Sequence, residues 1–211
     1  MPMTRRSALA SLAAAPAVLR GASSRRPGDK PNLLFLWTDE QRADTLAAYG
    51  NLRFRVPALN SLAARSIVFD RCYDTQPVCT PARSSVMTGQ WPHTTGCVTN
   101  NIPLPRDART MPELLNDPSY RTGYFGKWHL GDEVFAQHGF QEWISIEDGY
   151  AAYFSSDKPG DKRSSYHRFL EGHGYKPDTR QGTFSRGFAV HRRIDHCKPA
   201  FLAAESSRFI L

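Results

Sequence analysis

The segment around Cys79 combines a nucleophilic side chain and a cation at a spacing that suits anion chemistry. Pro81 and Gly89 predict a short helix that begins at or just after Cys79 and ends at Gly89. A side chain at a helix start faces free backbone N–H groups and the positive end of the helix dipole, which stabilise an anion. Arg83 lies one turn further on and can direct its guanidinium group back toward Cys79. The pattern predicts an anion site around Cys79, and the competing interpretation is an ordinary buried thiol.

Two acidic side chains follow the first strongly apolar run of the sequence. The run over residues 32–38 is typical of a strand that is buried on both faces, as in parallel sheets. It ends at Asp39 and Glu40, and ligands of open parallel sheets bind beyond the carboxyl ends of the strands. The two carboxylates are therefore candidate cation ligands, although an acidic residue here also suits the N-cap of a following helix.

Lys127 and His129 form a second candidate pair near the end of a strand predicted over residues 121–128. Residues two apart in a strand point to the same face, so the two side chains would lie together. Gly126 and Gly131 beside them permit close approach of other groups to the backbone. We interpret this face as part of an active site, and the alternative is a face exposed to solvent.

Helices and strands alternate along the chain in the order expected for βαβ units. This alternation predicts the α/β class, with a mostly parallel central sheet flanked by helices. Most of residues 145–185 lack clear periodicity and are interpreted as a surface excursion. Predicted helices cover residues 56–64, 79–88, 111–116 and 164–171, and predicted strands cover residues 32–38, 67–69, 121–128 and 198–204.

Length, charge and cysteine content exclude several classes of protein. A chain of 211 residues is long enough for one domain with a real core, and no apolar run has the roughly 18 residues of a stable membrane span. Five arginines among the first 26 residues account for most of the formal charge of +7 and leave +2 for the remainder. A nucleic-acid partner is therefore not expected. The four cysteines show no zinc-type spacing.

The N-terminal residues have the pattern of an export signal. Arg5 and Arg6 precede a mildly apolar run from Ala8 to Leu19, which small residues follow. The pattern resembles a twin-arginine signal, which implies the twin-arginine translocase as a partner and a periplasmic or secreted location. The alternative is a basic N-terminus with a short amphipathic helix. We assign residues 1–30 to the signal and linker and residues 31–211 to the catalytic domain.

Three ordered motifs resemble those of the type I sulfatases, which belong to the alkaline phosphatase superfamily. Cys79-Thr80-Pro81-Ala82-Arg83 fits the family signature Cys-x-Pro-x-Arg. The apolar run before Asp39 resembles the family's opening strand and metal segment, and Gly126-Lys127-Trp128-His129-Leu130-Gly131 matches a third motif. The likeness extends from about residue 31 to about residue 144 and implies the sulfatase-like α/β fold.

The resemblance implies a reaction and a role for each candidate residue. Cys79 would be oxidised to formylglycine by the formylglycine-generating enzyme and hydrated to a diol. One diol oxygen would attack the sulfur of a small-molecule or carbohydrate sulfate ester, and the other hydroxyl would then expel the sulfate. Arg83 would hold the diol, Lys127 would contact a sulfate oxygen, and His129 would orient or deprotonate the diol.

A divalent cation, calcium by resemblance, would complete the site. Asp39, Glu40 and the modified Cys79 would bind it, because calcium prefers hard oxygen ligands. Glu40 departs from the commoner Asp or Gln at this position, so its carboxylate reaches one methylene further than that of Asp. The remaining ligands of the family, which lie in its second half, are not visible in the sequence.

Three departures from an efficient sulfatase follow from the same residues. We expect a truncated catalytic domain, because residues 205–211 do not resemble the family, and we expect impaired turnover. A related hydrolase of phosphonate monoesters or phosphodiesters would use the same nucleophile and cation. A non-catalytic remnant would keep the anion pocket without the chemistry.

Overall fold

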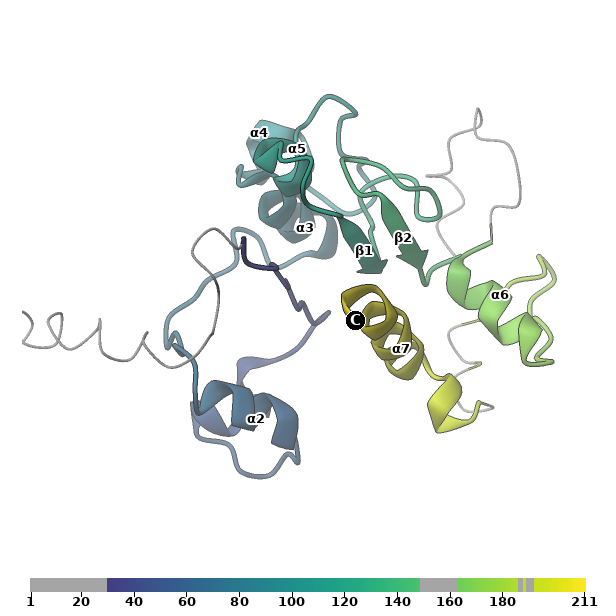
Figure 1. Ribbon diagram of the computed structural model, residues 1–211, viewed down its shortest axis with the longest axis horizontal. Helices are drawn as coiled ribbons and strands as arrows, with labels where there is room; N and C mark the ends of the chain where they lie inside the picture. Colours follow the sequence, from purple (N-terminus) through teal and green to yellow (C-terminus); the bar gives the residue numbers. More distant parts are fainter. Residues whose placement is uncertain (1–29, 149–162, 186–187, 189–191) are drawn as a thin grey trace, which may run out of the picture. The chain divides into compact units, whose positions relative to one another are not determined.

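The computed structural model describes residues 30–148, 163–185, 188 and 192–211 (Figure 1). The chain divides into two units, Met1–Arg42 and Ala43–Leu211. The predicted export signal over residues 1–30 lies outside the described residues except for Lys30. In the described ranges, none of the helices combines the length and the apolar character that crossing a membrane requires.

The described part of the first unit contains neither a helix nor a strand. The strand predicted over residues 32–38 is therefore wrong, and the large apolar side chains there, Leu33, Leu34, Phe35 and Leu36, are exposed. A strand requires hydrogen bonds to a neighbouring strand. Among the described residues, the one strand pair lies in the second unit, which also lacks the short strand predicted over residues 67–69.

The second unit is built from short helices and one pair of strands. The helices predicted over residues 56–64, 79–88, 111–116 and 164–171 are confirmed as α2, α3, α5 and α6. The elements in chain order are η1 (Ala43–Thr45), η2 (Ala47–Tyr49), α2 (Pro57–Ala63), α3 (Cys79–Thr88), α4 (Pro92–Thr95), α5 (Met111–Leu115), β1 (Gly123–Gly126), β2 (Glu142–Ser145), α6 (Ser165–Gly172), η5 (Ile194–His196) and α7 (Lys198–Ile210).

β1 and β2 form a parallel pair in which Gly123 is aligned with Glu142 and Gly126 with Ser145. β1 confirms the centre of the strand predicted over residues 121–128. The parallel pair with flanking helices agrees with the predicted α/β class (Figure 1). Parallel strands need a long connection, and here residues 127–141 supply it without a regular helix. This connection contains the candidate residues Lys127 and His129.

An aromatic cluster holds the connection against the two strands. The Trp128 side chain is fully buried, and its ring centroid lies 5.0 Å from that of Tyr124 in β1 and 5.3 Å from that of Trp143 in β2. Phe140 adds an edge-on contact to Tyr124 at 5.3 Å between centroids. Such ring pairs contribute stability beyond the apolar area that they bury. The backbone beside Lys127 and His129 is thereby packed on the sheet.

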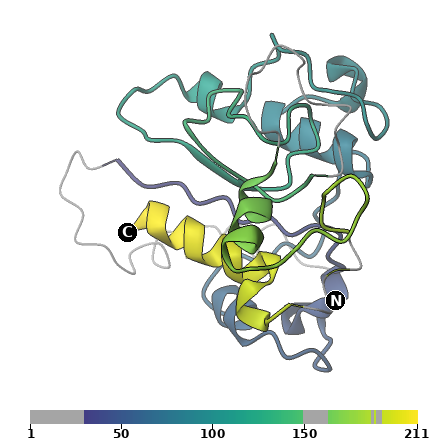
Figure 2. The ribbon, with the colours of Figure 1, turned by 90° about the vertical axis from the view of Figure 1, so that its right-hand side faces the viewer.

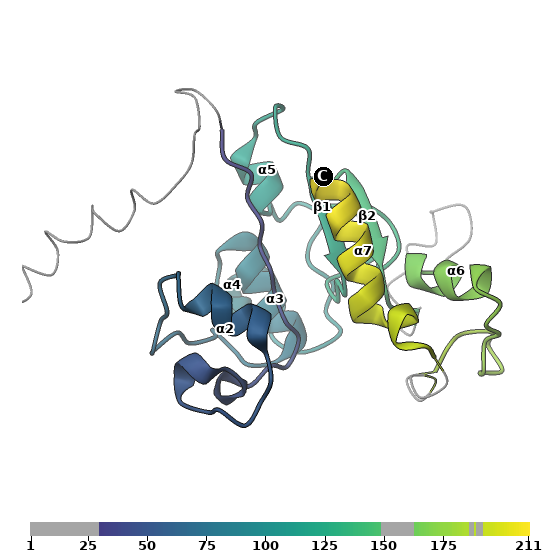
Figure 3. The same ribbon diagram turned by 60° about the horizontal axis from the view of Figure 1, so that its bottom comes forward.

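Residues 198–204, predicted as a strand, instead begin helix α7. Pro199 is compatible with a helical first turn, and Ala200, Ala203 and Ala204 are strong helix formers. Phe201 and Phe209 are two helical turns apart and so share a face. Figures 1 and 3 show α7 beside β1, where the ring centroids of Phe209 and Phe125 are 5.4 Å apart.

α6 packs against α7 and closes a small second core (Figure 2). The ring of Phe201 in α7 lies 5.3 Å from that of Tyr166 and 4.8 Å from that of Phe169, both in α6, measured between centroids. Leu170 of α6 and Phe188 are buried in the same cluster. Burial of these side chains is the apolar driving force that holds the two helices together.

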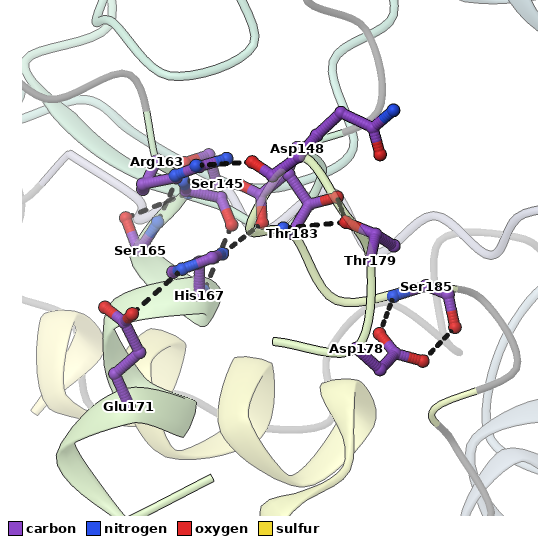
Figure 4. A network of polar contacts seen from close by, with 12 residues as sticks. Ser145, Asp148, Arg163, Ser165, His167, Glu171, Asp178, Thr179, Thr183 and Ser185 are labelled. Atoms are coloured by element: carbon purple, nitrogen blue, oxygen red, sulfur yellow. Dashed lines mark hydrogen bonds and ion pairs between the residues drawn. The ribbon is translucent and has the colours of Figure 1, made fainter. Parts of the chain in front are cut away.

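A buried histidine joins the start of α6 to the end of β2 (Figure 4). His167 Nδ1 lies 2.7 Å from Asp148 Oδ2, and His167 Nε2 lies 3.3 Å from Glu171 Oε1. Asp148 also accepts a hydrogen bond of 2.7 Å from the Ser164 backbone N–H. Because Asp148 serves donors on both sides, it anchors the helix start. Figure 4 also shows Asp178 accepting hydrogen bonds from Ser185.

We expect Asp148→Asn to lower the free energy of unfolding by about 1–3 kcal/mol, because an amide N–H₂ would face one of the two donors. Urea denaturation followed by circular dichroism measures the change. The control is Asp195→Asn, at a carboxylate that pairs with Arg193 on the surface and should contribute little. Equal effects of the two substitutions would contradict the anchoring role of Asp148.

Candidate active site

Cys79 is the first residue of α3, as the sequence predicts. Val78 before it is extended and provides no side-chain cap, so the helix start is left to other groups. The Asn100 side chain caps one donor, since its Oδ1 accepts the Thr80 N–H at 3.0 Å. Gly89 ends the helix in the left-handed conformation at φ 70°. The half-buried Cys79 side chain therefore lies at the positive end of a ten-residue helix.

Arg83 connects α3 to the residues that follow β1. Its side chain is buried, and Nη1 donates hydrogen bonds to the Lys127 carbonyl oxygen and, at 3.4 Å, to the Tyr124 hydroxyl. A guanidinium group is suited to this task because it presents several donors in a fixed plane. Arg83 thus holds the Lys127 backbone beside the helix, while its predicted contact with a hydrated residue 79 stays a prediction.

Lys127 brings a second positive charge to the helix start. Its Nζ lies 3.6 Å from Cys79 Sγ. The backbone around Lys127 is not the strand that the sequence predicts, because β1 ends at Gly126 and His129 has a positive φ of 57°. The two side chains therefore do not alternate along a strand. Gly126 suits its own backbone angle, φ 142°, because none of the described atoms lies within 4 Å of where a Cβ would be.

His129 is buried beside the first turn of α3. Its Nε2 lies 3.0 Å from Asn101 Oδ1, and its carbonyl oxygen accepts a 2.9 Å hydrogen bond from the Thr80 hydroxyl. The sequence analysis missed Asn101, which has φ 70° and belongs to the residue types that tolerate this conformation. The structure therefore brings Cys79, Lys127 and His129 to one end of α3.

The structure also reveals a buried carboxylate that the sequence analysis missed. Glu133 is fully buried and accepts backbone N–H hydrogen bonds from Trp128 at 3.1 Å and from His129 at 2.5 Å. Burial raises the pKa of Glu133 from its ordinary 4.5 to about 7, although the two hydrogen bonds and the charge of Arg83 oppose this shift. The sequence signal that could have identified Glu133 is its place four positions after His129.

The raised pKa of Glu133 predicts a pH-dependent stability. The unfolded carboxyl group releases its proton near pH 4.5 and the folded one near pH 7, so its stabilising contribution is complete below pH 4.5. As pH rises to about 7 we expect a loss of about 3 kcal/mol. Glu133→Gln cannot lose this proton. Denaturation at several pH values should show the wild-type advantage over the variant falling across this window, and a constant difference would contradict the shift.

The predicted metal ligands are divided between the two units. Asp39 and Glu40 belong to the first unit and are exposed, whereas Cys79 belongs to the second. The described residues contain no group of three or more His, Cys, Asp or Glu side chains that could hold a metal ion. Two adjacent accessible carboxylates nevertheless fit the preference of calcium for hard oxygen ligands. The calcium site stays a prediction.

The geometry around Cys79 suits a tetrahedral anion. The ammonium group of Lys127 lies beside the Cys79 side chain, which is at the positive end of the α3 dipole. The buried guanidinium group of Arg83 adds positive charge one helical turn away. Preorganised donors in a partly buried setting stabilise developing negative charge more strongly than water does. The arrangement can therefore bind an anion directly against a nucleophile.

Known proteins are similar to part of this chain. The chain is 33% identical over 141 residues to an ulvan-active sulfatase of Formosa agariphila, covering 62% of this chain and 28% of that protein. It is 39% identical over 107 residues to the uncharacterized sulfatase YidJ of Escherichia coli, covering 50% and 22%. It is 32% identical over 130 residues to N-acetylgalactosamine-6-sulfatase of Homo sapiens, covering 54% and 25%. The matched part of this chain thus spans about a quarter of the length of these relatives.

A solved structure has a similar backbone. It is that of a protein in complex with its substrate D-glucosamine-2-N,6-O-disulfate, and the two chains are 32% identical with a TM-score of 0.52. The similarity covers 58% of this chain and 24% of that chain. Residues 31–194 also match the family described as Sulfatase. Because this match covers most of the 211 residues, the chain belongs to the sulfatase family.

Proposed function

We propose that this chain carries the nucleophile and the sulfate-facing cations of a sulfuric ester hydrolase. The observation that supports this most directly is the 3.6 Å approach of Lys127 Nζ to Cys79 Sγ at the start of α3. The proposal assigns formylglycine to residue 79, and after hydration this group supplies the oxygen that attacks sulfur. The Cys-x-Pro-x-Arg signature at Cys79 supports this modification.

The surrounding residues bind and orient the sulfate group in this proposal. Lys127 contacts a sulfate oxygen, and the positive end of the α3 dipole favours the negative charge that develops there. Arg83 holds the Lys127 carbonyl oxygen and so sets the direction of the ammonium group. His129, fixed by Asn101, would orient or accept a proton from a hydroxyl on residue 79.

A calcium ion bound by Asp39 and Glu40 is part of the same proposal. When bound, the ion would polarise the oxygens that it contacts and neutralise negative charge. The exposed, adjacent carboxylates support this assignment through their donor chemistry. We expect chelation to lower activity reversibly, with recovery on addition of calcium.

We propose a sulfated carbohydrate as the substrate class. Three relatives support it by name: the ulvan-active sulfatase, an N-acetylglucosamine-6-O-sulfatase of Bacteroides thetaiotaomicron and the N-acetylgalactosamine-6-sulfatase. The solved structure with a bound glucosamine disulfate points to the same class. We further propose export by the twin-arginine translocase to the periplasm or beyond, which rests on the arginine pair and apolar run of the N-terminus.

A substrate comparison tests the proposed function. The 211-residue chain is co-expressed with a formylglycine-generating enzyme and assayed on an aryl sulfate, a 6-O-sulfated glucosamine and an aryl phosphonate monoester. We expect sulfate release from the first two substrates to exceed hydrolysis of the phosphonate. Preferred hydrolysis of the phosphonate would support the phosphorus-directed alternative. No hydrolysis by fully converted, folded chain would support the non-catalytic alternative.

A further inference from the structure

We propose that Glu133 is a positioning residue, whose buried carboxylate fixes the backbone of Trp128 and His129 so that Lys127 and His129 face residue 79. The inference deepens the proposed function and rests on it for its catalytic part. Glu133 has no contact with residue 79 among the interactions described here, so it would act through other residues. It belongs to none of the three motifs on which the resemblance rests.

The two oxygens of Glu133 divide the task between two consecutive peptide groups. Oε2 accepts the Trp128 N–H at 3.1 Å, and Oε1 accepts the His129 N–H at 2.5 Å. With a pKa of about 7, Glu133 is ionised above neutral pH, where these hydrogen bonds are charge-assisted and stronger than neutral ones. Because each oxygen serves one donor, the carboxylate fixes the orientation of both peptide planes. The orientation of these planes in turn determines the direction in which the neighbouring side chains leave the backbone.

Glu133 is itself held in place. Its carbonyl oxygen accepts a 2.9 Å hydrogen bond from Trp143 Nε1, so it is attached to the strand β2. Its side chain is fully buried. A carboxylate anchored at its backbone and enclosed by packing can define the position of its partners within a small range.

The backbone of Trp128 and His129 needs the hydrogen bonds that Glu133 accepts. His129 adopts φ 57°, in the left-handed region that is uncommon for residues other than glycine and that the surrounding structure must support. The same short segment carries the two groups that must reach the start of α3, Lys127 through its side chain and His129 through its ring and carbonyl oxygen. A small rotation of these peptide groups would displace both. Misplacement of catalytic groups by about 1 Å can cost about 100-fold in rate.

The charged groups near Glu133 are compatible with this role. Arg83 favours the ionised carboxylate, whereas Glu147 and burial oppose it. Arg83 also binds the Lys127 carbonyl oxygen, so a positive and a negative side chain hold the two ends of one peptide group, the C=O of Lys127 and the N–H of Trp128. Glu133→Gln keeps the shape of the side chain but places an N–H₂ group against one backbone N–H. The substitution therefore removes one of the two hydrogen bonds to the backbone without leaving a cavity.

The test compares Glu133→Gln with Glu142→Gln and Glu133→Asp in the full chain, matured with the formylglycine-generating enzyme. Glu142 pairs with Arg121 and Arg208 at the start of β2 and provides the same chemical change away from the site. We expect Glu133→Gln to lower kcat about 10-fold to 100-fold with little change in KM, as loss of outer-shell support does. Glu133→Asp, which keeps both acceptor oxygens, should retain more activity, and Glu142→Gln should match wild type.

Amide hydrogen exchange separates this inference from the proposed function. In Glu133→Gln, the Trp128 and His129 amides should exchange faster, whereas the β1 amides should keep their protection. Unchanged exchange at both amides would overturn the inference whether or not the chain hydrolyses sulfate esters. Faster exchange with an unchanged kcat would also overturn it, because Glu133 would then be structural only. If wild-type chain fails to hydrolyse sulfate esters, the proposed function fails, and the catalytic part of the inference fails with it.

Discussion

Cys79→Ala should lower sulfate ester hydrolysis by about 10⁴-fold or more, the scale on which removing a covalent nucleophile acts. The substitution removes the sulfur that the maturing enzyme would exchange for oxygen, so no nucleophile can form at the start of α3. Lys127 and the helix N-terminus would remain and could still bind sulfate. The measurement is kcat on an aryl sulfate, using chains purified after co-expression with the formylglycine-generating enzyme.

Cys72→Ala is the matched control for this result. Cys72 is an exposed thiol seven residues earlier and lies outside the Cys-x-Pro-x-Arg signature. We expect this variant to keep wild-type activity and wild-type conversion at position 79. Equal activity of Cys79→Ala and wild type would contradict covalent catalysis at residue 79.

Lys127→Met should lower kcat/KM for the aryl sulfate by about 10²-fold to 10³-fold, the usual scale for losing one charge-stabilising donor. Methionine keeps an unbranched chain of similar length but removes the ammonium group that lies 3.6 Å from Cys79 Sγ. The Arg83 hydrogen bond to the Lys127 carbonyl oxygen does not depend on the side chain and should persist. Inhibition by inorganic sulfate should weaken in parallel, because the same donor would bind product.

Lys176→Met provides the comparison for Lys127. Lys176 is exposed in the segment after α6, so its removal changes net charge equally without touching the site. We expect wild-type kinetics from this variant. Similar losses from both lysine substitutions would indicate a general effect of net charge, and no loss from Lys127→Met would contradict the assigned sulfate contact.

Local sequence signals predicted the elements that carry the nucleophile. Pro81 and Gly89 defined the limits of α3 because a proline suits a helical first turn and a glycine suits its left-handed end. α5 was predicted from its helical pattern over residues 111–116 and is stabilised by a capping box between Thr110 and Glu113. These features depend on neighbouring residues only, so a single sequence contains what is needed to predict them.

Elements that depend on distant partners were harder to predict. The apolar residues of α7 were compatible with either a buried strand or a helix, and their contacts with β1 and α6 determine the outcome. The run over residues 32–38 has strand-like composition but no strand partner among the described residues. Composition expresses a preference, whereas pairing is a property of the whole fold.

The candidate site was predictable in its residue types and less so in its geometry. Strand alternation was expected to place Lys127 and His129 on one face, but β1 ends at Gly126 and the Arg83 hydrogen bond holds the Lys127 backbone beside α3. Asn101 and Glu133 were missed because Asn101 pairs with an imidazole 28 residues along the chain, and Glu133 accepts hydrogen bonds from two backbone N–H groups that the sequence does not mark. Nothing in a residue type alone distinguishes a buried acceptor from a solvated acid.

The mass of the tryptic peptide that contains Cys79 tests the central claim most directly. Trypsin cleavage after Arg71 and Arg83 releases residues 72–83, which contain both Cys72 and Cys79. In chain co-expressed with the formylglycine-generating enzyme, we expect a mass about 18 Da lower than the unmodified peptide, with fragment ions assigning the change to residue 79. An intact thiol at Cys79 in that material would contradict the account.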